Sequence, residues 1–166
     1  MKASYKMLRI LYCTLTLSLI AVWGQSCMNK TESAVYSDMV IDTVAPVDEL
    51  KEGGEAEYGE YMRLNAIVRK AAHVIEYALV GFQVMCILFL RKKTKIRDYI
   101  TCVYIGLTVA LVDETIQIFS SRGPLILDLW IDLGGIVVGI GVALLIRLIV
   151  LKTKKSGIQE MITIEE

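Results

Sequence analysis

The sequence predicts an all-α integral membrane protein with four transmembrane helices and both termini in the cytoplasm. Three observations support this fold class. The composition is 55% hydrophobic with a mean hydropathy of +0.54, which is too apolar for an ordinary soluble domain. The apolar residues gather in four long runs, and the charged residues gather between those runs. With 166 residues the chain is long enough for one domain, so a single membrane domain is expected over 1–166.

The first helix is expected over about 8–28, because the twenty residues from Ile10 to Asn29 carry no formal charge. A basic start followed by an apolar centre also fits a signal peptide. The apolar part is long, however, and the residues at 22–27 form a poor cleavage site, so an uncleaved membrane helix is favoured. The next segment, 29–68, holds nine acids and is expected to be a solvated extracellular loop, which is flexible or loosely helical over Asp48–Glu60.

The remaining apolar runs predict three more membrane helices, at about 69–90, 98–119 and 125–150. The positive-inside rule orients them, because cytoplasmic segments of membrane proteins carry an excess of Lys and Arg. The N-terminus, the connection at 91–97 and the start of the tail, at 152–155, are basic, whereas 29–68 is acidic. Both termini and the tail at 152–166 are therefore expected in the cytoplasm.

Composition also argues against several kinds of partner and site. No basic stripe is present, so a nucleic-acid partner is not expected. Cys13, Cys86 and Cys102 lie inside apolar runs, where cysteine acts as a small hydrophobic residue. No CxxC spacing exists, so the sequence predicts neither a disulfide framework nor a cysteine metal site.

Each of the last three helices contains an uncharged stretch that is too short to span a bilayer. These stretches are Tyr77–Leu90, Tyr99–Val112 and Leu133–Ile146, each of fourteen residues, whereas a spanning helix needs about twenty. Each helix must therefore bring about six residues of its polar end into the membrane. In the predicted topology all three polar ends lie on the outer side, so their charged residues are expected in one layer near the external interface.

The polar residues of this layer form the candidate site, which we call the outer cup. An ionisable residue at the centre of a membrane helix costs roughly 2.5–3.5 kcal/mol on insertion scales, so it persists mainly where it faces a partner, a cavity or a substrate. The candidate ligand-binding residues are Arg69, Lys70, His73, Glu76 and Tyr77 of the second helix, Asp113, Glu114 and Gln117 of the third, Arg122 of the next turn, and Asp128 and Asp132 of the fourth.

Helical spacing predicts how these three helices meet. Residues four apart share a face, and each polar face continues inward as small residues, which let membrane helices approach closely. The small residues are Gly81 in the second helix, Gly106 and Ala110 in the third, and Gly135 and Gly139 in the fourth. We therefore expect a tight inner core beneath the outer cup, with His73 facing the Asp113–Gln117 side of the third helix.

The chemistry of the outer cup is left open by the sequence. His73 is the only histidine, which excludes a multi-histidine metal site. The spacing His73-x-x-Glu76 suits metal ligands, and nearby acids could complete an oxygen-rich site, so a divalent cation is considered as a cofactor without being assigned. The alternative is a network of ion pairs that only holds the helices together. In either case Arg122 is expected within reach of Glu114, Asp113 or Asp128.

Two groups of these residues resemble the signatures of VanZ-like membrane proteins. Arg69-Lys70-x-x-His73-x-x-Glu76-Tyr77-x-x-x-Gly81 resembles the first signature, and Asp113-Glu114-x-x-Gln117, followed by Arg122, Asp128, Asp132 and Gly135, resembles the second. The resemblance covers roughly 8–147. Position 116 is isoleucine, where many members have histidine, which weakens any mechanism that needs a second histidine.

The resemblance implies a multi-pass protein of the bacterial cell membrane, because founding members are linked to low-level teicoplanin resistance in Gram-positive bacteria. The expected partners are membrane lipids, a lipid-linked envelope precursor or the glycopeptide antibiotic itself. The first hypothesis is binding of such a molecule at the outer leaflet. The second is an intramembrane enzyme acting on a lipid head group, with His73 or Glu114 as general acid or base and Asp113 as a metal ligand. The third is a structural or assembly protein.

Overall fold

The computed structural model describes residues 2–91, 95–120 and 126–165, and it confirms the all-α class, with no strand in these residues. The helices are α1 (Lys2–Ser26), α2 (Lys30–Ile41), α3 (Val47–Glu52), α4 (Glu55–Arg91), α5 (Ile96–Phe119) and α6 (Ile126–Glu165). Four segments within the described residues are long and apolar enough to cross a membrane, namely Tyr5–Ser26, Glu55–Arg91, Ile96–Phe119 and Ile126–Lys154.

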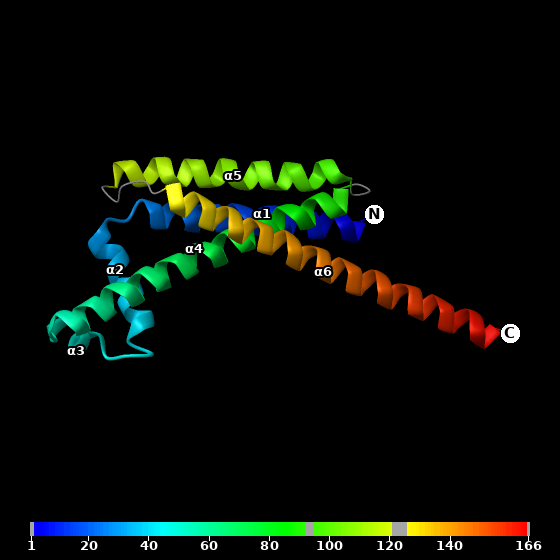
Figure 1. Ribbon diagram of the computed structural model, residues 1–166. Helices are drawn as coiled ribbons and strands as arrows, with labels where there is room; N and C mark the ends of the chain where they lie inside the picture. The colour runs from blue at the N-terminus through cyan, green and yellow to red at the C-terminus, as the bar shows by residue number, and fades with distance from the viewer. Residues whose placement is uncertain (1, 92–94, 121–125, 166) are drawn as a thin grey trace.

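Helix α4 is the centre of the arrangement, because it contacts each of the other five helices. Helix α6 crosses α4 and also packs on α5, while α1 packs against α4 and α5 (Figure 1). The short helices α2 and α3 cover the first half of α4. The N-terminus, the end of α4 and the C-terminal part of α6 point toward one end of the molecule, and α2 and α3 lie at the other.

Helices α4 and α6 approach closely at glycines, which confirms the predicted core of small residues. A Cβ atom added to Gly81 would lie 2.7 Å from the Ile136 carbonyl oxygen of α6. A Cβ atom added to Gly135 would lie 2.7 Å from the Val74 carbonyl oxygen of α4, and one added to Gly139 would clash with the Ala78 carbonyl oxygen. The two backbones are therefore in direct contact over more than one turn.

Two hydrophobic cores result from this packing. The larger core lies inside the bundle of α1, α4, α5 and α6, where Tyr77, Met85 and Ile136 are fully buried. The smaller core lies between α2, α3 and α4 and consists of buried Ile41, Val47, Leu50 and Tyr61. The first core belongs to the apolar runs, and the second belongs to the acidic segment that follows α1.

The segment 29–68 is more regular than the predicted flexible or loosely helical loop, because most of it lies in α2, α3 and the start of α4. Asn29 begins α2 with a capping box, in which its side chain accepts from the Glu32 backbone N–H at 2.9 Å and the Glu32 carboxylate accepts from the Asn29 N–H at 3.0 Å. Helix α4 begins at Glu55 rather than at 69, and α6 continues to Glu165 beyond the predicted end at 150. The acids of 29–68 do not prevent these helices, since most lie on exposed faces around the smaller core.

Candidate functional site

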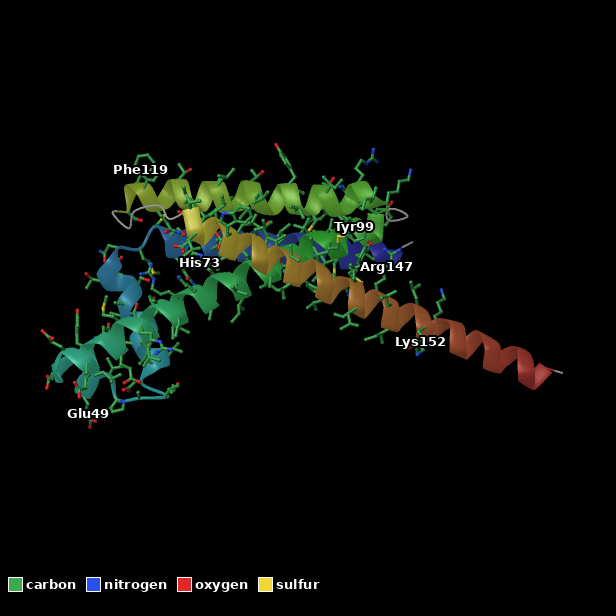
Figure 2. All side chains as sticks on the ribbon, viewed as in Figure 1. Glu49, His73, Tyr99, Phe119, Arg147 and Lys152 are labelled. Carbon is green, nitrogen blue, oxygen red and sulfur yellow. The ribbon has the colours of Figure 1, made fainter. Side chains whose placement is uncertain are left out.

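Three polar side chains from three helices meet where α4 passes the end of α5 and the beginning of α6. They are His73 of α4, Asp113 of α5 and Asp132 of α6, and one ligand atom from each lies within 4.8 Å of the other two. We call these residues the His73–Asp113–Asp132 cluster. Figure 2 shows His73 near the start of α6, at the same end of the bundle as α2. The prediction that His73 faces α5 is therefore confirmed.

His73 is held by contacts on two sides. Its Nδ1 lies 3.1 Å from Oδ1 of Asp132, whose side chain is fully buried. Its ring stacks on the Tyr77 ring one turn along α4, with centroids 6.3 Å apart and planes 9° apart. The His73 side chain keeps 19% of its surface exposed, so the imidazole forms a boundary between the buried acids and the outside of the bundle.

Asp113 is fully buried and receives two hydrogen bonds. The Ser26 hydroxyl at the end of α1 donates to Oδ1, and Gln117 Nε2, one turn along α5, donates to Oδ2 at 2.9 Å. Ser26 and Gln117 are themselves buried. These bonds fix the orientation of the carboxylate and tie α1 to α5 at the depth of the cluster.

Several buried polar atoms near the cluster are not hydrogen-bonded within the described part of the chain. They include Oδ2 of Asp132, the hydroxyl of Tyr77 and Oδ1 of Asp128. The Tyr77 hydroxyl interacts electrostatically with both Asp113 and Asp132, so it lies in the same polar region. A buried polar group without a partner costs about 1–3 kcal/mol, and such groups are typical of sites that receive a ligand, a water molecule or an ion.

A cavity of about 490 Å³ opens beside the cluster, between α1, α2 and α4. Its volume lies in the range typical of small-molecule sites. The apolar part of its wall consists of Ile20, Ala21, Met28, Val40, Val68 and Ala72, and the polar part of Gln25, Ser33, Tyr36, Ser37, Arg69 and His73. We call it the α1–α2–α4 cavity. His73 therefore separates this cavity from the buried acids behind it.

Arg69 and His73 also line a second, smaller cavity of about 140 Å³ on the α6 side of α4, together with Lys70 and Asp128. Arg69 is half-buried and Lys70 is exposed. Among the described residues, no carboxylate forms an ion pair with either of these two cations. The positive charge of Arg69 is thus available to an anion in either cavity.

The structure brings most of the predicted outer-cup residues to one end of the bundle. Glu76 interacts with Gln25 of α1 and with His73, and Glu114 is buried next to Asp113. The predicted contact of Arg122 with Glu114, Asp113 or Asp128 lies outside the described residues. The spacing His73-x-x-Glu76 suggested a metal pair within one helix, whereas the acids that meet His73 closely in the cluster come from α5 and α6.

Sequence reasoning missed Ser26 and Gln25 of α1 as members of the site. Both stand at the polar end of the first helix, where the chain leaves the membrane in the predicted topology. The depth argument that selected residues of the other three helices would have selected these two as well. Their partners, Asp113 and Glu76, would still have required the packing of α1 against α4 and α5.

The arrangement supports two kinds of chemistry. The Arg69 guanidinium lines a largely apolar cavity and has no ion pair among the described residues, so the site suits an anionic group attached to an apolar chain. An imidazole with two buried carboxylates suits a divalent cation.

Comparison with known proteins adds the family. The model of the VanZ/LLP1 family matches residues 7–147, which is most of the chain. Neither the curated proteins nor the solved structures contain a match. The match includes all four segments that could cross a membrane, either whole or in large part, and every residue of the outer cup. Such a chain is consistent with a multi-pass membrane protein, and it belongs to the VanZ/LLP1 family.

Proposed function

We propose that the protein binds the anionic head group of a cell-envelope lipid, or of a lipid-linked envelope precursor, in the α1–α2–α4 cavity at the outer leaflet. The observation that carries this proposal is Arg69, a half-buried cation that lines the cavity and forms no ion pair with a described carboxylate. Guanidinium groups bind phosphates and carboxylates through two parallel hydrogen bonds. The apolar wall of the cavity suits the first part of a lipid chain.

The proposal requires the cavity to face the outside of the cell. The basic N-terminus and the basic residues at 91–97 and 152–155 favour the cytoplasm, and the acidic segment 29–68 favours the outside. A variant without the four native cysteines would test this with an impermeant thiol reagent in intact cells. Glu55→Cys should be labelled, and Lys152→Cys should be labelled only after lysis. The opposite pattern would place the cavity on the cytoplasmic side and overturn the proposal.

In cells, head-group binding is proposed to lower susceptibility to teicoplanin, whose lipid chain places it at the same leaflet. The test compares teicoplanin susceptibility of a Gram-positive host that carries wild type, Arg69→Gln, His73→Ala or the control Arg63→Gln. Arg63 is exposed on α4 and lies outside both cavities beside the cluster. Membrane levels of each variant are measured in parallel. The two site variants should lose protection, and the control should keep it.

Two results would contradict the proposal. If all variants protect equally at equal membrane levels, the cavity has no part in function. If Arg69→Gln and His73→Ala lose protection only because they fail to accumulate, the polar residues hold the fold together, as in a structural or assembly protein. Exchange of His73 and Asp132 would separate these cases, because a purely structural pair recovers when its partners are swapped.

A second candidate is an intramembrane enzyme that acts on the same head group. It is favoured by the 3.1 Å contact between His73 Nδ1 and Asp132 Oδ1 at the cavity wall, since a carboxylate that orients an imidazole is common in general acid–base catalysis. The purified protein would be incubated with envelope lipids and the lipid masses compared before and after. A changed head group with wild type, and none with His73→Gln, would favour the enzyme over the binding protein.

A further inference from the structure

We infer that the His73–Asp113–Asp132 cluster binds one divalent transition-metal ion, with Zn²⁺ and Mn²⁺ as the ions that its ligands suit best. The three residues come from α4, α5 and α6, so one ion would join three helices. The inference concerns ion binding alone. It is tested on lipid-free protein, so it stands or falls separately from the proposed head-group function.

The geometry of the cluster is close to that of a coordination sphere. Three atoms within 4.8 Å of one another have a centre that lies no more than about 2.8 Å from each of them, whereas metal bonds to histidine and carboxylate are about 2.0–2.2 Å long. Side-chain shifts of less than about 1 Å would complete the site. The 3.1 Å separation of His73 Nδ1 and Asp132 Oδ1 already equals the distance between neighbouring ligands in a roughly octahedral site.

The burial of two carboxylates also favours a cation in the cluster. Asp113 and Asp132 are both fully buried, and burial of an ionised carboxylate costs several kcal/mol unless the charge is compensated. Within the described residues, the only basic side chain that contacts either of them is His73. A divalent ion would neutralise both acids at once and would leave the imidazole neutral, as a ligand must be.

A second, independent feature points to a ligand. Oδ2 of Asp132 is buried in a side chain with 0% exposure, and it has no hydrogen-bond partner among the described residues. The hydroxyl of Tyr77, also in a residue with 0% exposure, lacks a described partner and lies in the same polar region. A metal ion held by both oxygens of Asp132 would also take Oδ2, and a water molecule on that ion would donate to the Tyr77 hydroxyl oxygen.

The surroundings of the cluster match those of known kinds of metal site. Ser26 and Gln117 hold the Asp113 carboxylate in place, as outer partners of metal ligands commonly do. Three protein ligands leave coordination positions open, which is typical of sites that bind water or substrate. His73 lines the α1–α2–α4 cavity, so an ion can enter from there and can meet an anion bound there.

The choice of ion follows from the ligands. An imidazole nitrogen suits Zn²⁺ and other transition metals, whereas Mg²⁺ and Ca²⁺ prefer all-oxygen sites. Two carboxylates with one imidazole fit Zn²⁺ and Mn²⁺ better than Cu⁺, which favours thiolate and thioether ligands. Cys102, the one buried cysteine among the described residues, donates to the Gly81 carbonyl oxygen at 3.4 Å and is not a member of the cluster.

The test measures metal content. Purified protein in detergent is stripped with chelator, incubated separately with Zn²⁺, Mn²⁺, Mg²⁺ or Ca²⁺, desalted and analysed by inductively coupled plasma mass spectrometry. Wild type should retain about one Zn²⁺ or Mn²⁺ per chain and little Mg²⁺ or Ca²⁺. Asp132→Asn and His73→Gln should retain less than about a tenth as much. The control Asp98→Asn, at the opposite end of α5, should match wild type.

Ser26→Ala provides a graded readout, because loss of an outer partner of a metal ligand typically weakens metal affinity about 10–100-fold. Thr16→Ala removes an exposed hydroxyl from the same helix and should leave the affinity unchanged. The unfolding temperature of each variant is recorded with and without metal. Wild type and the controls should gain most stability from the ion, Ser26→Ala should gain less, and Asp132→Asn and His73→Gln should gain almost none. Should Asp132→Asn fail to fold, the measurement on His73→Gln decides, because the His73 side chain is 19% exposed whereas that of Asp132 is fully buried. Wild type that retains neither Zn²⁺ nor Mn²⁺, or His73→Gln that binds as wild type does, would overturn the inference.

Discussion

The contact between α4 and α6 gives a sharp prediction, because neighbouring glycines of α6 differ in what surrounds them. A Cβ atom at Gly135 would lie 2.7 Å from the Val74 carbonyl oxygen and 2.9 Å from Tyr77 Cβ. A Cβ atom at Gly134 would have nothing within 4 Å. Gly135→Ala and Gly134→Ala therefore make the same chemical change at adjacent positions. Gly135→Ala creates a steric conflict with α4, and Gly134→Ala creates none.

The size of the effect follows from these distances. Ordinary Cβ contacts begin at 3.4 Å, so Gly135→Ala must separate the backbones by about 0.7 Å. Forcing an extra methyl group into a packed interior costs about 1–3 kcal/mol. Gly134→Ala should range from neutral to stabilising by up to about 1 kcal/mol, because alanine favours the helix more than glycine does.

The shift of α6 caused by Gly135→Ala should also disturb the contact between Asp132 and His73. Asp132 lies one turn before Gly135, and an outward shift of α6 by about 0.7 Å would lengthen the 3.1 Å contact with His73 beyond hydrogen-bonding distance. The assay is reversible unfolding in mixed detergent and sodium dodecyl sulfate micelles, which gives the free energy of unfolding for each variant. Equal free energies for Gly135→Ala and Gly134→Ala, within about 0.5 kcal/mol, would refute the close approach of α4 and α6.

Two further predictions concern stability. Ser26→Ala removes the hydroxyl that donates to buried Asp113, so it should cost about 1.5–3 kcal/mol, whereas Thr16→Ala should cost less than about 0.5 kcal/mol in the same unfolding assay. Asp38→Asn weakens a partly exposed pair with Lys51 at 2.6 Å but keeps an amide oxygen that can accept from the Tyr61 hydroxyl, so it should cost at most about 1 kcal/mol. The hydrogen bond to Asp38 raises the pKa of Lys51, so the pair stabilises the fold below the ordinary lysine pKa and loses this effect as pH rises through the raised value. The difference between wild type and Asp38→Asn should therefore shrink at strongly alkaline pH, and a difference that grows there would contradict the pairing.

The sequence predicted the features that depend on periodicity along one helix. Uncharged stretches located the last three membrane helices, and residues four apart located the close approach of α4 and α6 at Gly135 and Gly139. The shared depth of the polar ends predicted that His73 would meet acids from α5. These inferences succeed because a membrane fixes the depth of each helix, and depth together with helical phase nearly determines which side chains can meet.

Features that depend on packing between helices could not be predicted in the same way. Nothing in the sequence shows that Ser26 turns toward Asp113, because the helices against which α1 packs cannot be identified from the sequence. The acidic segment 29–68 was expected to be solvated because its charge outweighs its few apolar residues. Ile41, Leu50 and Tyr61 nevertheless form a small core, since each can pack against a neighbouring helix that the sequence alone does not identify.

Head-group binding at Arg69 is tested most directly by the lipid that the protein retains. Native mass spectrometry would count lipid molecules bound to the protein released from detergent containing phosphatidylglycerol, with phosphatidylcholine as the zwitterionic comparison. Wild type and Arg63→Gln should retain one phosphatidylglycerol. Arg69→Gln should bind it about 10–100-fold more weakly, because a hydrogen bond to a charged group contributes about 1.5–3 kcal/mol. Equal retention by wild type and Arg69→Gln, or equal retention of both lipids by wild type, would contradict binding of an anionic head group in this cavity.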